Sequence, residues 1–270
     1  MNHLHAVEAG APTAGLRIRG LSHRYGLTEV LAGIDLDLAP GETLALIGPS
    51  GCGKSTLLHL VAGLLVPSEG TLANGFRRIG CMFQQPRLLP WKSTLDNIAL
   101  GLKARGEARA DRRERAAAMA RWLGLTDEDM AKFPHALSGG MQSRVALGRA
   151  LVVAPDLLLL DEPFSALDVG LKAELYGLLR ARVAEVGSAV LMITHDLMEA
   201  VRLADRILMM APGPGRLVRS FTLSQPQAVR SEAWIYRTAG ELMEAEEVRL
   251  GFGLADARPA NGWPAAAGGR

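Results

Sequence analysis

Eight consecutive residues, 48–55, have the types and spacing of a loop that binds phosphate. An apolar run precedes them and a helical pattern follows, which is the context such a loop requires. Glycines let successive backbone N–H groups point inward around an anion, and the N-terminal end of the following helix adds positive charge. In such a loop Lys54 reaches the β- and γ-phosphates, and the Ser55 hydroxyl ligates Mg²⁺. The expected nucleotide contacts are Gly48, Pro49, Ser50, Gly51, Cys52, Gly53, Lys54, Ser55 and Thr56.

Two acids follow the most apolar run of the chain and extend this chemistry. Residues 157–160 are all leucine, and Asp161 and Glu162 come next. An acid that ends a buried parallel strand lies at the carboxyl edge of the sheet, where ligands bind in α/β proteins. There Asp161 can hold Mg²⁺ through water, and Glu162 can orient and deprotonate an attacking water. The alternative is that both acids only cap the strand.

A histidine and a second glycine-rich turn could also contact phosphate. His195 follows a third apolar run, at 188–194, although a lone histidine at a strand end is more often structural. Residues 137–141, Leu-Ser-Gly-Gly-Met, open a helix and offer a hydroxyl, two glycines and a helix N-terminus. That combination predicts a second anion site. Two phosphate sites on one chain indicate a nucleotide sandwiched between two subunits.

The elements that must position these residues alternate along the chain. Apolar runs at Thr43–Ile47, Leu157–Asp161 and 188–194 predict strands, and helices are expected at 54–62 and 170–186. Alternation of strand and helix predicts an α/β fold with a parallel sheet.

Other segments differ from this core. Residues 85–153 show helical patterns without a convincing strand, which predicts an inserted helical subdomain, and the mixed charges at 103–115 predict an exposed helix within it. The predicted organisation is a flexible tail at 1–14, one catalytic domain at 15–220, and a C-terminal extension at 221–270 that is largely irregular after 252.

Composition limits the class of protein. The chain has 270 residues, 49% hydrophobic and 21% charged, so a mostly disordered chain is excluded. A net charge of +2 is not the excess of positive charge that is typical of nucleic-acid-binding proteins. Cys52 and Cys81 cannot form a disulfide scaffold, nor a zinc site by themselves. We expect neither a bilayer-spanning segment nor a secretory signal, because no sufficiently long apolar stretch occurs.

In their order and spacing, the motifs resemble those of the ATP-binding-cassette (ABC) ATPases. The resemblance implies that Tyr25 stacks on adenine, that Gln84 is the Q-loop glutamine, and that His195 is the switch histidine. Ser165 and Asp168 match the D-loop of that family. The implied fold is a P-loop NTPase (RecA-like) core with a parallel sheet, a small antiparallel β region around 70–78 and an inserted helical subdomain.

The resemblance also implies an ATPase that works as a pair. ATP on the phosphate loop of one chain is closed by Ser138, Gly139 and Gly140 of a second copy or of a paralogous cassette. Glu162, His195 and Gln84 are the implied catalytic residues. The other implied contacts are Ser138, Gly139, Gly140 and Met141 for ATP in trans, and Ser55, Gln84 and Asp161 for the Mg²⁺ that accompanies ATP.

A place in a bacterial transporter follows from the same resemblance. The sequences at 87–91, 96–102 and 211–216 resemble those of ATPases in the nitrate/sulfonate/taurine importer group. The implied partners are integral membrane permease subunits and, indirectly, a substrate-binding protein, but no nucleic acid. The implied location is peripheral, on the cytoplasmic face of the inner membrane. Trp91 and Leu89 are expected to form an exposed apolar contact patch, with core packing as the alternative.

Two other classes stay open. A soluble ABC-type ATPase acting on DNA or ribosomes would usually carry two cassettes, coiled-coil arms or zinc insertions. A GTPase would need an Asn-Lys pair to read its base, which this chain lacks, and a small-molecule kinase would not need residues 137–141. The chain departs from the family at Met141, where glutamine is usual, and at Ser143.

Overall fold

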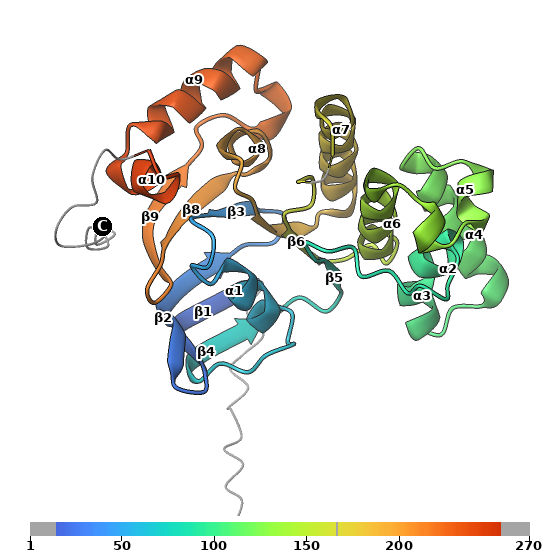
Figure 1. Ribbon diagram of the computed structural model, residues 1–270, viewed down its shortest axis with the longest axis horizontal. Coiled ribbons are helices and arrows are strands. Elements are labelled where there is room, and N and C mark those ends of the chain that lie inside the picture. Colours follow the sequence, from blue (N-terminus) through green and yellow to red (C-terminus); the bar gives the residue numbers. More distant parts are fainter. Residues whose placement is uncertain (1–14, 166, 255–270) are drawn as a thin grey trace, which may run out of the picture.

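The computed structural model describes residues 15–254 except residue 166 (Figure 1). The predicted tail at 1–14 and the residues after 254 lie outside this described part. A six-stranded sheet with the order β5-β6-β7-β3-β8-β9 forms the centre; β9 alone is antiparallel to its neighbour. The predicted α/β fold is therefore confirmed. The strands are β3 (Thr43–Ile47), β5 (Ile79–Met82), β6 (Leu157–Asp161), β7 (Ala189–Ile193), β8 (Arg206–Ala211) and β9 (Arg216–Thr222).

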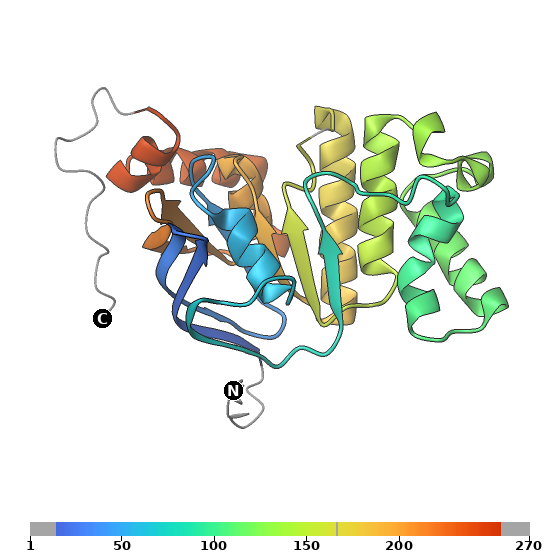
Figure 2. The same ribbon diagram turned by 60° about the horizontal axis from the view of Figure 1, so that its bottom comes forward.

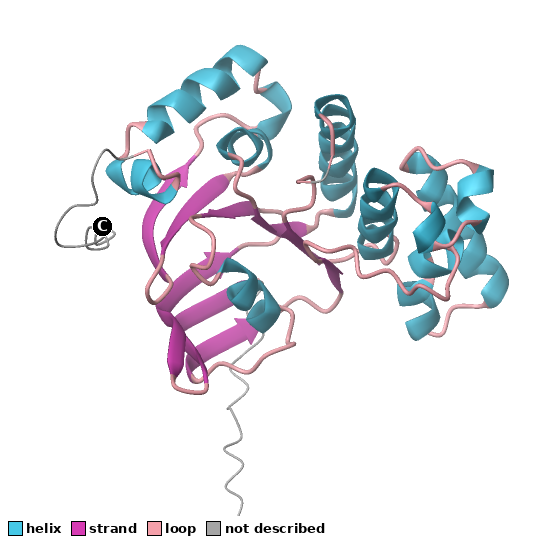
Figure 3. Ribbon diagram, viewed as in Figure 1, coloured by secondary structure: helices cyan, strands magenta, loops and turns pink. Residues whose placement is uncertain are grey.

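The three strands predicted from apolar runs lie inside this sheet. Every residue of β3, β6 and β7 is buried. Helix α1 (Lys54–Val61) packs on one face of the sheet, and α7 (Val169–Val186) and α8 (Leu197–Leu203) pack on the other (Figure 3). Strands covered on both faces need apolar side chains at successive positions, which explains the unbroken runs.

A second sheet of three antiparallel strands lies beside the first, in the order β2-β1-β4. Its strands are β1 (Leu16–Tyr25), β2 (Thr28–Leu38) and β4 (Glu69–Asn74). The predicted antiparallel region is thus present, but the prediction placed it only at 70–78. Two of its three strands come from residues 16–38.

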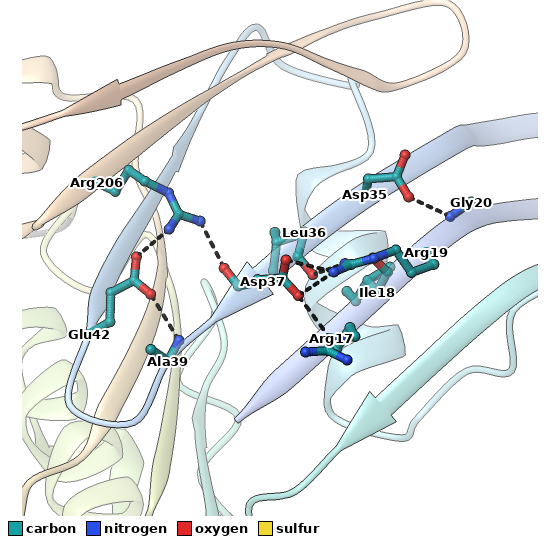
Figure 4. A network of polar contacts seen from close by, with 10 residues as sticks. All are labelled: Arg17, Ile18, Arg19, Gly20, Asp35, Leu36, Asp37, Ala39, Glu42 and Arg206. Carbon is teal, nitrogen blue, oxygen red and sulfur yellow. Dashed lines mark hydrogen bonds and ion pairs between the residues drawn. The ribbon is translucent and has the colours of Figure 1, made fainter. Parts of the chain in front are cut away.

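A polar network fixes the two sheets to each other (Figure 4). Arg206 on β8 donates from Nη2 to the backbone oxygen of Asp37 on β2 at 2.8 Å, and pairs with Glu42 at 2.8 Å. The Asp37 carboxylate accepts from Arg19 of β1 at 2.8 Å, and this bond is the main cause of the lowered pKa of Asp37. Because Glu42 comes immediately before β3, the network holds the antiparallel sheet against the strand that carries the phosphate loop.

Between β5 and β6 the elements in the described chain are all helical. Helix α6 packs on β5 so closely that a Cβ at Gly80 would lie 2.4 Å from the backbone oxygen of Ala150. Residues 103–115 are largely exposed, as predicted, but they do not form one helix: the segment ends α3, passes through a turn and begins α4. The helices are α2 (Thr94–Ile98), α3 (Leu100–Ala104), α4 (Arg109–Trp122), α5 (Asp127–Ala131), the 3₁₀ turn η1 (Pro134–Ala136) and α6 (Gly139–Leu151).

The C-terminal segment returns to the core as helices. After the short turn η2 (Gln227–Val229), α9 (Glu232–Met243) packs on α8, and α10 (Glu246–Gly251) lies against β8. Ser231 caps α9 by accepting the N–H of Trp234. Across the part of the chain that the structure describes, no helix combines the length and apolar character needed to cross a bilayer.

Candidate functional site

The phosphate loop connects the end of β3 to the start of α1, as predicted. Gly48, Gly51 and Gly53 have φ of 151°, 79° and 96°, a region that side chains disfavour. A Cβ at Gly48 would lie 2.4 Å from the backbone oxygen of Met210, so this position cannot accept a larger residue without movement. The glycines therefore serve both the conformation of the loop and its close packing on β8.

Lys54 is held inside its own loop. Its Nζ donates to the backbone oxygens of Gly48 at 2.8 Å and Pro49 at 2.9 Å. The ammonium is thus fixed at the mouth of the loop, where an anion can be attracted. The side chain of Cys52 is buried in the core, and burial raises the pKa of the thiol.

A cleft of about 270 Å³ opens over the loop. Most of its lining was predicted from the sequence, including two residues from distant segments, Gln84 and Glu162. Val30 also lines it and was not predicted, because an apolar residue at the end of a hairpin carries no chemical signal. The residues around the cleft are Val30, Ser50, Gly51, Gly53, Lys54, Ser55, Thr56, Gln84 and Glu162.

Three candidate catalytic side chains meet at the edge of this cleft. Oε2 of Glu162 lies 3.2 Å from Nε2 of Gln84 and 3.2 Å from Nδ1 of His195. Glu162 and His195 come just after the adjacent strands β6 and β7, in which Asp161 pairs with Ile193. Glu162 also has a φ of 47°, a left-handed conformation that is uncommon outside glycine. Its N–H donates to the backbone oxygen of Ile193 at 2.9 Å, which helps to hold that conformation.

The residues predicted to ligate Mg²⁺ form a suitable set of oxygen donors. Asp161 is buried, and burial raises its pKa, while a hydrogen bond with the Ser55 hydroxyl acts in the opposite direction. Gln84 faces Glu162 with its amide nitrogen, which leaves its amide oxygen for another partner. A carboxylate, a hydroxyl and an amide oxygen are hard donors that fit Mg²⁺, which is usually held by one or two carboxylates together with substrate phosphates.

The segment 137–141 is not part of the same cleft. Ser138 caps α6 by accepting the N–H of Met141 at 3.3 Å, and both Ser138 and Gly139 are exposed. Helices α1 and α6 lie on opposite sides of β5 and β6 (Figure 2), so one chain does not bring this segment to its own phosphate loop. The segment instead presents a helix N-terminus to the outside.

Tyr25 and the two D-loop candidates do not line the cleft. Tyr25 ends β1 with half of its surface exposed and packs edge-on against the ring of His23. Ser165 donates its hydroxyl to the backbone oxygen of Glu162 at 3.1 Å. Asp168 caps α7 by accepting the N–H of Leu171 at 2.9 Å. The two D-loop candidates thus connect Glu162 to the start of α7.

A separate exposed loop carries the expected contact patch. Trp91 is 69% exposed, so the core-packing alternative is wrong for this residue, while Leu89 is half-buried. The loop is held by the fully buried Asn97, whose amide nitrogen donates to the backbone oxygens of Leu89, Lys92 and Ser93. The sequence did not reveal this role of Asn97, because a polar residue in a helical pattern gives no sign that its side chain will hydrogen-bond to the backbone of a neighbouring loop.

Comparisons with known proteins agree on one family. A family model described as ABC transporter matches residues 31–165. The chain is 43% identical over 232 residues to aliphatic sulfonates import ATP-binding protein SsuB 2 of Xanthomonas axonopodis pv. citri, covering 83% of this chain and 77% of the relative. It is 44% identical over 210 residues to taurine import ATP-binding protein TauB of Chromobacterium violaceum, covering 75% of this chain and 79% of the relative.

Solved structures give the same result. The dimeric structure of MJ0796, a bacterial ABC transporter cassette, matches with a TM-score of 0.72 and 29% identity, over 78% of this chain and all of that one. A dimeric post-hydrolysis state of the same cassette, bound to ADP and Pi, matches with a TM-score of 0.71 over the same shares.

Proposed function

The chain belongs to the ABC transporter family, and from that membership we propose that it is the ATP-hydrolysing subunit of an importer of small sulfonate anions. The observation that carries the ATPase activity is the meeting of Gln84, Glu162 and His195 at the edge of the phosphate-loop cleft. The named relatives that import aliphatic sulfonates and taurine support the substrate class.

In this proposal, Glu162 accepts a proton from the attacking water. Its carboxylate is half-buried at the cleft and is oriented by Gln84 and His195, so it is directed at one position. The phosphate loop and Lys54 hold the phosphates of ATP, with Tyr25 on the adenine. Mg²⁺ would be held by Ser55, Asp161 and Gln84, and when bound it neutralises charge on the phosphates.

A second copy of the chain, or a paralogous cassette, completes the site. Support comes from Ser138 and Gly139, which are exposed at the N-terminus of α6 and do not line the phosphate-loop cleft in the described part of the chain. Ser138, Gly139, Gly140 and Met141 would then contact ATP on the partner's phosphate loop, with Ser165 and Asp168 alongside. The dimeric cassettes that resemble this chain agree with such an arrangement.

Membrane permease subunits are the proposed partners of the exposed loop with Trp91. Asn97 holds this loop in one conformation, which suits a docking surface more than a random surface turn. The subunit would sit peripherally on the cytoplasmic face of the inner membrane and meet a substrate-binding protein only through the permease. No role in binding nucleic acid is proposed.

Glu162→Gln tests this function with a minimal change in shape. The variant should bind ATP without hydrolysing it and should elute as a dimer in ATP and Mg²⁺ during size-exclusion chromatography. Glu241→Gln makes the same chemical change on the exposed face of α9 and should behave as wild type. A Glu162→Gln protein that stays monomeric under these conditions would contradict the sandwich arrangement.

The substrate class needs a separate experiment. The permease that co-purifies with the tagged chain leads to its binding protein, whose ligand can be measured by calorimetry. We expect an alkanesulfonate or taurine to bind. A binding protein that takes only sugars or cations would overturn the substrate proposal and leave the ATPase proposal intact.

A further inference from the structure

A buried acid on α8 is connected to both neighbours of His195. Glu199 is 4% exposed, and its Oε2 accepts the hydroxyl proton of Thr194. The same hydroxyl oxygen accepts the N–H of Asp196 at 3.0 Å. One carboxylate is thereby linked, through Thr194, to the residue before and the residue after His195.

The helix does not need this carboxylate as a cap. Asp196 already caps α8, because its Oδ1 accepts the N–H of Glu199 at 3.1 Å. The other oxygen of Glu199, Oε1, is buried without a hydrogen-bond partner in the described part of the chain. Burying an acid with an unpaired oxygen opposes folding. The buried carboxylate of Glu199 therefore destabilises the fold without being needed to cap α8, which indicates that it has a role outside the helix.

The side chain of His195 depends on such support. Its side chain is 63% exposed, and its polar contact among the described residues is with Glu162. Because little packing surrounds the imidazole, its position follows from the backbone turn at 194–196. The link between Glu199 and Thr194 braces that turn through residues that do not line the cleft.

We propose that Glu199 is a positioning residue for ATP hydrolysis, which acts through Thr194 to keep the imidazole of His195 beside Glu162. This proposal rests on the proposed ATPase function. Charged groups around the acid are Asp196 and Glu162, which share its sign, and Lys172, whose Nζ lies 3.9 Å from Oδ2 of Asp196. Glu199 therefore belongs to a charged cluster behind the switch histidine rather than to the cleft itself.

Substitutions at both ends of the link test the proposal. Glu199→Ala and Thr194→Val should each lower kcat about tenfold, because a small displacement of a catalytic group is enough to slow the reaction. The KM for ATP should stay within about twofold, since neither residue lines the cleft. Thr194→Ser keeps the hydroxyl and Glu199→Gln keeps an acceptor oxygen, so both should stay within about threefold of wild type.

Coupling between the two residues separates positioning from general damage. The double variant Thr194→Val/Glu199→Ala should be no slower than the slower single variant, because both changes break one link. Additive losses, or a raised KM with normal kcat, would overturn the proposal. Glu241→Gln on α9 controls for loss of an acid elsewhere.

A second measurement does not depend on activity. In the nucleotide-free protein, the NMR signal of the His195 ring, assigned by its loss in His195→Ala, should shift in Thr194→Val and in Glu199→Ala but not in Glu241→Gln. An unmoved signal in both variants would refute the proposal even if they fold normally. If wild type proves inactive, the proposed function fails, whereas this spectrum still decides whether Glu199 positions His195.

Discussion

Oε2 of Glu162 and Nδ1 of His195 lie 3.2 Å apart at the ends of adjacent strands. The contact exists because β6 and β7 are parallel and in register, so their carboxyl ends place the next residues side by side. Gln84 reaches the same carboxylate oxygen from the end of β5. Three neighbouring strands thus bring the three candidate catalytic side chains together at the edge of the phosphate-loop cleft.

Replacing His195 should affect turnover more than binding. We expect His195→Ala to lower kcat by about a hundredfold or more, with the affinity for ATP within about threefold of wild type, because the imidazole contacts Glu162 but does not itself line the cleft. Steady-state turnover and equilibrium binding of a fluorescent nucleotide measure the two effects. His135→Ala, at an exposed histidine of η1, is the control. Weakened binding with normal kcat would count against this role.

Replacing Lys54 should remove binding itself. The ammonium that the loop carbonyls hold would be absent in Lys54→Ala, so we expect ATP affinity to fall about a hundredfold and turnover to become undetectable. Lys103→Ala removes an exposed lysine from α3 and should change neither quantity. Normal turnover by Lys54→Ala would show that this loop is not the site.

Much of this arrangement could be predicted from sequence because the chemistry lies at strand ends. The unbroken leucines of β6 are typical of a strand covered on both faces, and the acids after such a strand were expected at the edge of the sheet. Glu162 was predicted in this way, whereas the phosphate loop was predicted from the types and spacing of its own residues. Gln84, Tyr25 and the D-loop residues came from the family resemblance, since nothing in their local spacing marks them.

Other features depend on contacts that one sequence does not display. The pairing of β1 with β2 shifts register between Ile18 and Leu21 and again before His23, so the alternating pattern of a half-buried strand is broken. The link from Thr194 to Glu199 joins the end of a strand to a buried face of a helix. The hydrogen bonds from Asn97 to the Trp91 loop likewise depend on the three-dimensional position of that loop, which the sequence does not show.

Removing the exposed indole of Trp91 should abolish stimulation of ATP turnover by the permease without affecting basal hydrolysis. Trp91→Ala should leave the free energy of unfolding within about 0.5 kcal/mol of wild type, because the side chain is mostly in solvent. Basal ATP turnover should be unchanged, whereas stimulation by the reconstituted permease should be lost. Val229→Ala, another exposed apolar residue, should keep full stimulation. Full stimulation of Trp91→Ala would contradict the docking role of this loop.

The buried acid on α8 gives stability a defined pH dependence. Burial, with a smaller contribution from Asp196, raises the pKa of Glu199 to about 7, although Thr194 and Lys172 act against this shift. Between the ordinary pKa of 4.5 and about 7, the folded chain holds a proton that the unfolded chain has released, so the free energy of unfolding falls as pH rises.

Glu199→Gln should remove this dependence. Relative to wild type, the variant should gain up to about 3 kcal/mol in the free energy of unfolding between pH 4.5 and pH 8, with the gain complete above pH 7. Urea unfolding at both ends of this range measures the difference, and other titrating groups cancel between the two proteins. A difference that is constant with pH would show that Glu199 is ionised normally.

The central claim is that each ATP is hydrolysed between the phosphate loop of one chain and residues 137–141 of another. Mixing two inactive proteins, Lys54→Ala and Ser138→Arg, tests this claim directly. In a mixed dimer one site carries both defects and the other carries neither, so turnover should recover to about a quarter of wild type, since about half of randomly mixed dimers are heterodimers. A mixture that is no more active than its separate components would contradict the account.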